Sequence, residues 1–145
     1  MPVNAAIARN AAWNASAISA CTTACRAGSR AAMAPGPDGA RTLRYVNPTT
    51  GGAVMPTLDC AAMRLSSGAM TRKRRVTYNM ICLVVAGGGH SRIGEHTFDW
   101  GQHDVFTIPH WTWACHQAIG GEADLFVVSD RAAFENLDLV REEIE

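Results

Sequence analysis

Residues Gly68–Gly87 read GAMTRKRRVTYNMICLVVAG, and residues His103–Ala118 read HDVFTIPHWTWACHQA. Both stretches consist of short apolar runs interrupted by polar residues, and glycine stands at both ends of the first. Side chains two positions apart in a β-strand lie on the same face, so Arg74 and Val76 should point in one direction. The two stretches therefore predict strands of a sheet, with turns where glycine permits a positive φ.

The same pattern of short apolar runs separated by turn residues extends on both sides, from Leu43 to Asp130. This pattern is typical of an all-β barrel or sandwich. Helical spacing of apolar residues after Asp130 predicts a short C-terminal helix over 131–139. The acidic end around Glu142 is most simply a solvated tail. The predicted strands are 43–46, 54–65, 70–78, 80–86, 90–93, 96–99, 105–108, 111–118 and 124–129.

Residues 1–34 are rich in alanine, which has the highest intrinsic helix propensity. The segment Pro35-Gly36-Pro37-Asp38-Gly39 then prevents the helix from continuing. We expect residues 1–39 to form a helical arm with a linker, and residues 40–145 to form a single barrel domain.

The composition limits the classes of partner. The 145 residues are enough for one domain, and the 13 basic and 13 acidic residues give no net charge. This balance predicts neither a nucleic-acid partner nor an anionic membrane partner. The apolar runs are also shorter than a membrane span. Five cysteines without a C-x-x-C pair favour reduced thiols and a cytoplasmic location.

The spacing of the two stretches matches the two cupin motifs, G-x5-H-x-H-x3,4-E-x6-G and G-x5-P-x-G-x2-H-x3-N. Further strings, among them LRYVNPTTGG at 43–52, FDW at 98–100 and LFVVSD at 125–130, resemble the C-terminal cupin domain of gentisate 1,2-dioxygenases. Salicylate and 1-hydroxy-2-naphthoate dioxygenases are similar. The resemblance implies a double-stranded β-helix, the cupin jelly-roll barrel, in a group of iron-dependent, ring-cleaving enzymes.

The chain departs from this pattern at each position where the resemblance implies a metal ligand. These positions hold Arg74, Val76, Met80 and Ala114. A guanidinium stays protonated and presents only donors, while valine and alanine side chains have no lone pair to offer. We therefore expect neither a metal nor another cofactor.

If these positions still face the lumen, they form a small polar receptor among apolar walls. Arg74 would pair with a carboxylate, and His116 or Tyr78 would carry a proton in catalysis. The expected ligand is a small aromatic or polyketide-like molecule with an anionic or phenolic group. The predicted ligand-binding residues are Arg74, Val76, Met80, Cys82, Thr112, Trp113 and Ala114.

Structural alternatives stay open for each polar residue. Arg74 could pair with an acid or reach the barrel rim, Tyr78 could lie exposed at a strand end, and His116 could be a structural histidine.

Three functional readings also remain. The first is a metal-free, stand-alone cupin that binds its ligand, with or without catalysing a non-oxidative cyclisation, isomerisation or decarboxylation. The second is a non-enzymatic structural or partner module, and the third is a ring-cleaving dioxygenase resembling gentisate 1,2-dioxygenase. A homodimer formed through exposed sheet edges is expected.

Overall fold

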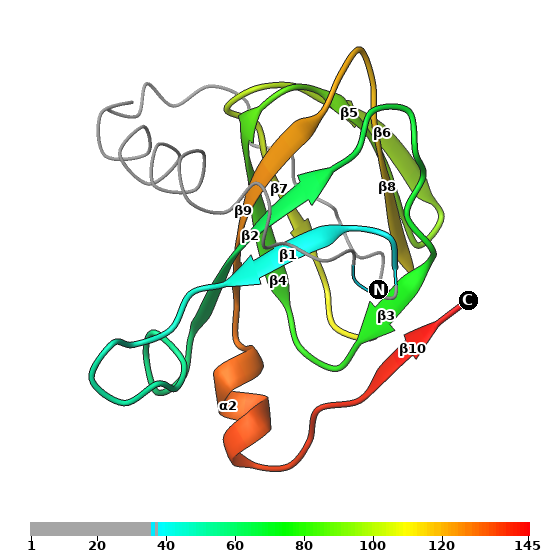
Figure 1. Cartoon of the computed structure of the whole chain (residues 1–145). Coiled ribbons are helices and arrows are strands. Elements are labelled where there is room, and N and C mark those ends of the chain that lie inside the picture. The colour runs from blue at the N-terminus through cyan, green and yellow to red at the C-terminus, as the bar shows by residue number, and fades with distance from the viewer. Residues whose placement is uncertain (1–35, 37) are drawn as a thin grey trace.

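The computed structural model describes residue 36 and residues 38–145, which form two antiparallel sheets facing each other (Figure 1). The first sheet has the order β1 (Arg41–Arg44), β2 (Asp59–Leu65), β9 (Ala123–Ser129), β4 (Met80–Ala86) and β7 (Val105–Ile108). The second has the order β10 (Glu142–Ile144), β3 (Arg74–Val76), β8 (Ala114–Ala118), β5 (Gly89–Ile93) and β6 (His96–Trp100). Helix α2 (Arg131–Asn136) follows β9. The predicted all-β jelly-roll class is confirmed.

Alternation along the strands builds the core between the sheets. In β9 every second residue is buried, beginning with Ala123 and ending with Ser129. The aromatic ring of Phe106 is fully buried and contacts the rings of Phe98 and Trp100. One end of the barrel lies near α2 and β10, which are orange and red in Figure 1.

Four positions within the two stretches have a left-handed backbone. Gly68 and Gly87 have φ of 70° and 83°, and His103 and Trp111 have φ of 72° and 52°. These are the four glycine positions of the two cupin patterns. The left-handed conformation costs a non-glycine residue about 1–2 kcal/mol. The backbone turns are therefore retained at His103 and Trp111 although the glycines are not.

Several strands are shorter than the sequence predicts. The strand expected over 54–65 begins at Asp59, after Pro56, which has no N–H for a sheet ladder. The strand expected over 111–118 begins at Ala114, because the left-handed backbone of Trp111 interrupts the extended conformation. The strand expected over 70–78 is reduced to β3. The C-terminal helix ends at Asn136.

The acidic residues of the C-terminal tail are exposed, as predicted, but the tail also forms a strand that the sequence did not predict. Residues Glu142–Ile144 form β10, which pairs with β3 in antiparallel register. The expected linker also reaches the barrel, since the Asp38 carbonyl accepts a hydrogen bond from the Arg72 amide and Ala40 is fully buried. The predicted arm over 1–34 lies outside the described residues. In the described part of the chain, no helix has the length and apolar character that crossing a membrane requires.

Candidate functional site

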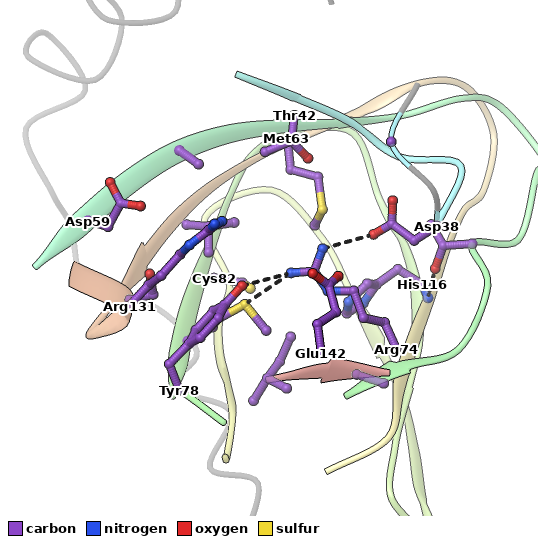
Figure 2. Close-up of a pocket in the computed structure, with 18 of the residues that line it drawn as sticks. Asp38, Thr42, Asp59, Met63, Arg74, Tyr78, Cys82, His116, Arg131 and Glu142 are labelled. Atoms are coloured by element: carbon purple, nitrogen blue, oxygen red, sulfur yellow. Dashed lines mark hydrogen bonds and ion pairs between the residues drawn. The ribbon is translucent and has the colours of Figure 1, made fainter. Parts of the chain in front are cut away.

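A cavity of about 260 Å³ lies between the sheets (Figure 2). Strands β2, β4, β7 and β9 supply most of its apolar wall, which includes Ala61, Met63, Met80, Cys82, Ile108 and Val127. The polar groups come from both sheets and from the chain segments beside them, with Thr42, Arg44, Asp59 and Ser129 on the first sheet. They include Asp38, Arg74, Tyr78, His116, Arg131 and Glu142.

The structure brings six of the nine predicted site residues to this cavity, namely Arg74, Tyr78, Met80, Cys82, Ala114 and His116. Arg74 and Ala114 are register partners across β3 and β8, so their side chains are neighbours. The other three predicted residues do not line it. Val76 is buried without lining the cavity, and the Thr112 hydroxyl donates to the His110 carbonyl. Trp113 lines a second, smaller cavity together with Lys73 and Glu145.

Arg74 is surrounded by partners but held loosely by all of them. Its guanidinium lies 3.3 Å from the Asp38 carboxylate and 3.4 Å from the Glu142 carboxylate. It donates to the Tyr78 hydroxyl at 3.4 Å and to the Met80 sulfur at 4.0 Å. In Figure 2 these groups surround the guanidinium inside the cavity. The sequence-based alternative of an ion-paired Arg74 is therefore observed together with a position in the lumen.

These distances are long for charge-assisted hydrogen bonds, which usually measure about 2.7–2.9 Å. Elsewhere in the described residues, the ion pairs measure 2.5–2.8 Å, as between Arg64 and Asp124 at 2.6 Å. The Arg74 side chain is 25% exposed, and that of Asp38 is 10% exposed. Arg74 is thus a mostly buried cation whose donors are incompletely satisfied.

His116 is fixed by a short hydrogen-bond relay that runs through the core. The Trp100 Nε1–H donates to the Ser91 hydroxyl oxygen at 2.7 Å, and that hydroxyl lies 2.7 Å from His116 Nδ1. The relay is satisfied throughout when Ser91 donates its hydrogen to Nδ1. The imidazole then carries its own hydrogen on Nε2, as a donor for the cavity that His116 lines.

Burial keeps this imidazole uncharged. Loss of solvation in the core, together with the positive charge of Arg74, lowers the pKa of His116 from 6.5 to about 4. At neutral pH His116 is therefore a weak base. Its chemical capacity is that of a neutral hydrogen-bond donor, which differs from the proton carrier expected from the sequence.

The shift predicts a specific loss of stability in acid. Between about pH 6.5 and pH 4 the unfolded chain binds a proton at His116 that the folded chain does not bind, so stability falls as the pH falls. The contribution over this range is about 3 kcal/mol. Urea unfolding of wild type and His116→Gln from about pH 7.5 to pH 4 should show a stability difference that shrinks by this amount. Parallel profiles would contradict the assignment.

Tyr78 lies between two guanidinium groups. Its hydroxyl accepts the hydrogen bond from Arg74, and the Arg131 guanidinium lies 5.8 Å from its ring centroid. Burial raises the pKa of Tyr78, against the lowering effect of Arg74 and Arg131. The phenol therefore keeps its proton and can donate a hydrogen bond. Burial likewise raises the pKa of the Cys82 thiol to about 12, so Cys82 serves as an apolar wall.

The residues of the site and its support that sequence reasoning missed include Asp38, Arg44, Asp59, Ser91, Arg131 and Glu142. Asp38 stood in a segment interpreted as a linker, and Ser91 is an unremarkable residue in a predicted strand. A signal for Glu142 was available, because the acidic run at 142–145 is complementary to the basic run at 72–75.

The iron that the resemblance implies does not fit the side chains at these positions. Arg74 brings a permanent positive charge to the place of a ligand, and Val76 and Ala114 offer no donor atom. Within residues 36 and 38–145, no group of three or more His, Cys, Asp or Glu side chains is arranged to hold a metal ion.

No protein-family model matches the sequence. The gentisate 1,2-dioxygenase 1 of Aquipseudomonas alcaligenes is 36% identical over 100 residues, which cover 69% of this chain and 28% of that protein. A crystal structure of salicylate 1,2-dioxygenase from Pseudoaminobacter salicylatoxidans with gentisate superposes with a TM-score of 0.72 at 36% identity. It covers 78% of this chain and 30% of the solved one.

A cupin 2 domain-containing protein from Halorhodospira halophila shares the fold alone, with a TM-score of 0.57 at 19% identity over 67% of this chain and 68% of that one. The chain spans less than a third of the length of the curated dioxygenases that it matches. It is thus similar to a domain-sized part of them. The chain has the cupin jelly-roll fold, and it resembles the C-terminal cupin domain of the gentisate 1,2-dioxygenases.

Proposed function

We propose that the barrel cavity binds a small aromatic molecule with an anionic or phenolic group, without using a metal. The loose coordination of Arg74 carries this proposal. A cation with four partners at 3.3–4.0 Å gains free energy when an incoming anion offers it shorter contacts. The relatives named above support the aromatic class, since their names refer to gentisate and salicylate.

The size of the cavity favours a ligand with one ring. An apolar cavity of about 150 Å³ accommodates benzene, whereas pockets for drug-sized ligands begin at about 300 Å³. The 260 Å³ found here therefore suit a single ring with one or two small substituents. The apolar wall from β2, β4, β7 and β9 would contact the ring faces, and the polar groups around Arg74 would contact the substituents.

The donors suit a non-oxidative reaction at such a ligand. Arg74 would hold the anionic group, while the neutral Nε2–H of His116 and the hydroxyl of Tyr78 would donate to a second oxygen. A neutral imidazole can polarise a carbonyl group and stabilise a developing enolate. Decarboxylation of a polyketide-like β-keto acid forms such an enolate by loss of CO2 and needs no base. Isomerisation and cyclisation would also need a carboxylate of the cavity, such as Asp38 or Glu142, to accept the proton from carbon. In this proposal His116 and Tyr78 are the catalytic residues and Arg74 binds the ligand.

The primary test is calorimetric titration of the purified protein with two single-ring probes, benzoate and phenol. We expect both to saturate with about one equivalent per chain, because one cavity of suitable size and chemistry is available. If neither probe binds, the proposed function is wrong and a non-enzymatic structural or partner module becomes the better account. A homodimer and a cytoplasmic location stay predictions.

A dioxygenase activity is the second candidate, because the relatives with 30% or more identity are named as dioxygenases. The two candidates differ in metal content. We expect protein prepared in iron-supplemented medium and then dialysed to carry far less than one equivalent of iron, zinc or manganese. The measurement is elemental analysis, with oxygen consumption recorded in the presence of gentisate and salicylate. Near-stoichiometric iron together with oxygen uptake would establish the dioxygenase.

A further inference from the structure

Strand β10 adds a row of acids to the basic run that contains β3. Glu142, Glu143 and Glu145 form ion pairs with Arg74, Arg75 and Lys73, at 3.4, 2.5 and 2.5 Å. The backbone register places Glu142 opposite Val76, and the Glu145 amide donates to the Lys73 carbonyl. The acids of one strand thus match the bases of the other pair by pair.

Alternation along β10 gives the first two glutamates different environments. Glu142 lines the cavity, and Figure 2 shows its carboxylate beside the Arg74 guanidinium. Glu143 is paired with Arg75, which lies 4.5 and 4.7 Å from the ring centroids of Trp111 and Trp113 and does not line the cavity. Two neighbouring residues of the same type therefore have a lumenal and an external role.

Glu142 is also the more easily displaced of the two carboxylates at Arg74. Its side chain is 39% exposed, and it belongs to a three-residue edge strand supported by exposed ion pairs. Pairs of this kind contribute about 0–1 kcal/mol each and are screened by salt. Asp38 is more deeply buried and accepts a hydrogen bond from the Ala40 amide, which fixes its position.

We propose that Glu142 is a specificity-determining residue that competes with the anionic group of the ligand for Arg74. This inference rests on the proposed function and adds a selection by charge. An anionic ligand has to displace the Glu142 carboxylate and tolerate its repulsion, whereas a neutral phenol does not. Strand β10 therefore biases the cavity against anions, and its displacement opens the cavity to them.

The test compares Glu142→Gln with Glu143→Gln, two isosteric changes of the same charge on adjacent residues. Calorimetric titration uses benzoate as the anionic probe and phenol as the neutral one. Glu142→Gln should tighten benzoate binding about tenfold, because it removes a like charge within a few ångströms of the bound carboxylate. It should leave phenol binding within about twofold of wild type, and Glu143→Gln should leave both affinities within the same limits.

The titrations separate a failure of the charge competition from a failure of the proposed function. If wild type binds the probes but Glu142→Gln changes benzoate binding no more than Glu143→Gln does, the competition is absent and the proposed function stands. If no protein binds either probe, the proposed function fails and the inference fails with it. Glu142→Ala serves as a second variant, and it should reproduce the gain for benzoate if charge is the cause.

Discussion

Replacement of Arg74 by alanine is expected to weaken benzoate binding by about 2–5 kcal/mol, the usual effect of leaving a buried charge without its partner. Two features of the site add to this loss. Asp38 and Glu142 would both remain near the vacated position, and their negative charges would then act on the ligand without compensation. Arg74→Lys should recover only part of the affinity, because an ammonium group lacks the planar fork of a guanidinium.

Arg75→Ala is the matched control for this experiment. Arg75 is the next residue on β3, but its partners Glu143, Trp111 and Trp113 lie away from the cavity. The control should therefore bind benzoate as wild type does. Arg74→Ala should cost less than about 1 kcal/mol of folding stability, because its ion pairs are long and partly exposed. Unchanged affinity with a large loss of stability would make Arg74 a structural ion-pair partner.

The triple variant Arg74→His, Val76→His, Ala114→His should gain a divalent-metal site with micromolar or better affinity, which corresponds to about −8 kcal/mol. The backbone supports this expectation. Arg74 and Ala114 are register partners across β3 and β8, and Val76 lies on the same face of β3 as Arg74. Three imidazoles at these positions would supply the nitrogen ligands that zinc and ferrous iron accept. Isothermal titration with zinc would measure the gain.

The corresponding control moves one histidine to the outer face, as Arg75→His, Val76→His, Ala114→His. It contains the same number of new imidazoles, but position 75 faces Trp111 and Trp113. It should bind zinc at least tenfold more weakly. Equal affinities would attribute binding to histidine content alone. A folded triple variant that binds no zinc would show that the three positions do not converge.

The register of the barrel was accessible from the sequence because it depends on backbone turns at fixed intervals. Gly87, Gly120 and Gly121 adopt the positive φ expected of their glycine turns, and Gly68 adopts it as well. At His103 and Trp111 the same turns persist with side chains that disfavour them, so the intervals were more informative than the residue types. Inward-facing positions such as Arg74, Ala114 and His116 followed from this register.

The hydrogen-bond and ion-pair partners of these residues could not be predicted from the sequence in the same way, because they depend on long-range contacts. Asp38 reaches Arg74 from 36 positions away, and Ser91 fixes His116 from 25 positions away. Neither contact is associated with a periodic residue pattern that would reveal it in the sequence. Strand ends were also misplaced where one residue interrupts the ladder, as Trp111 does before β8. The state of His116 required knowledge of its burial, which decides whether an imidazole is charged.

The contact of Arg75 with Trp111 and Trp113 links the tryptophan fluorescence of the protein to the position of strand β10. The guanidinium lies over both indoles on one side and holds Glu143 of β10 on the other. Any event that lifts β10 from β3 changes the charge next to two fluorophores. The contribution of Trp111 and Trp113 to the emission of the four tryptophans should therefore change when the strand moves, and Trp100→Phe with Trp13→Phe would isolate it.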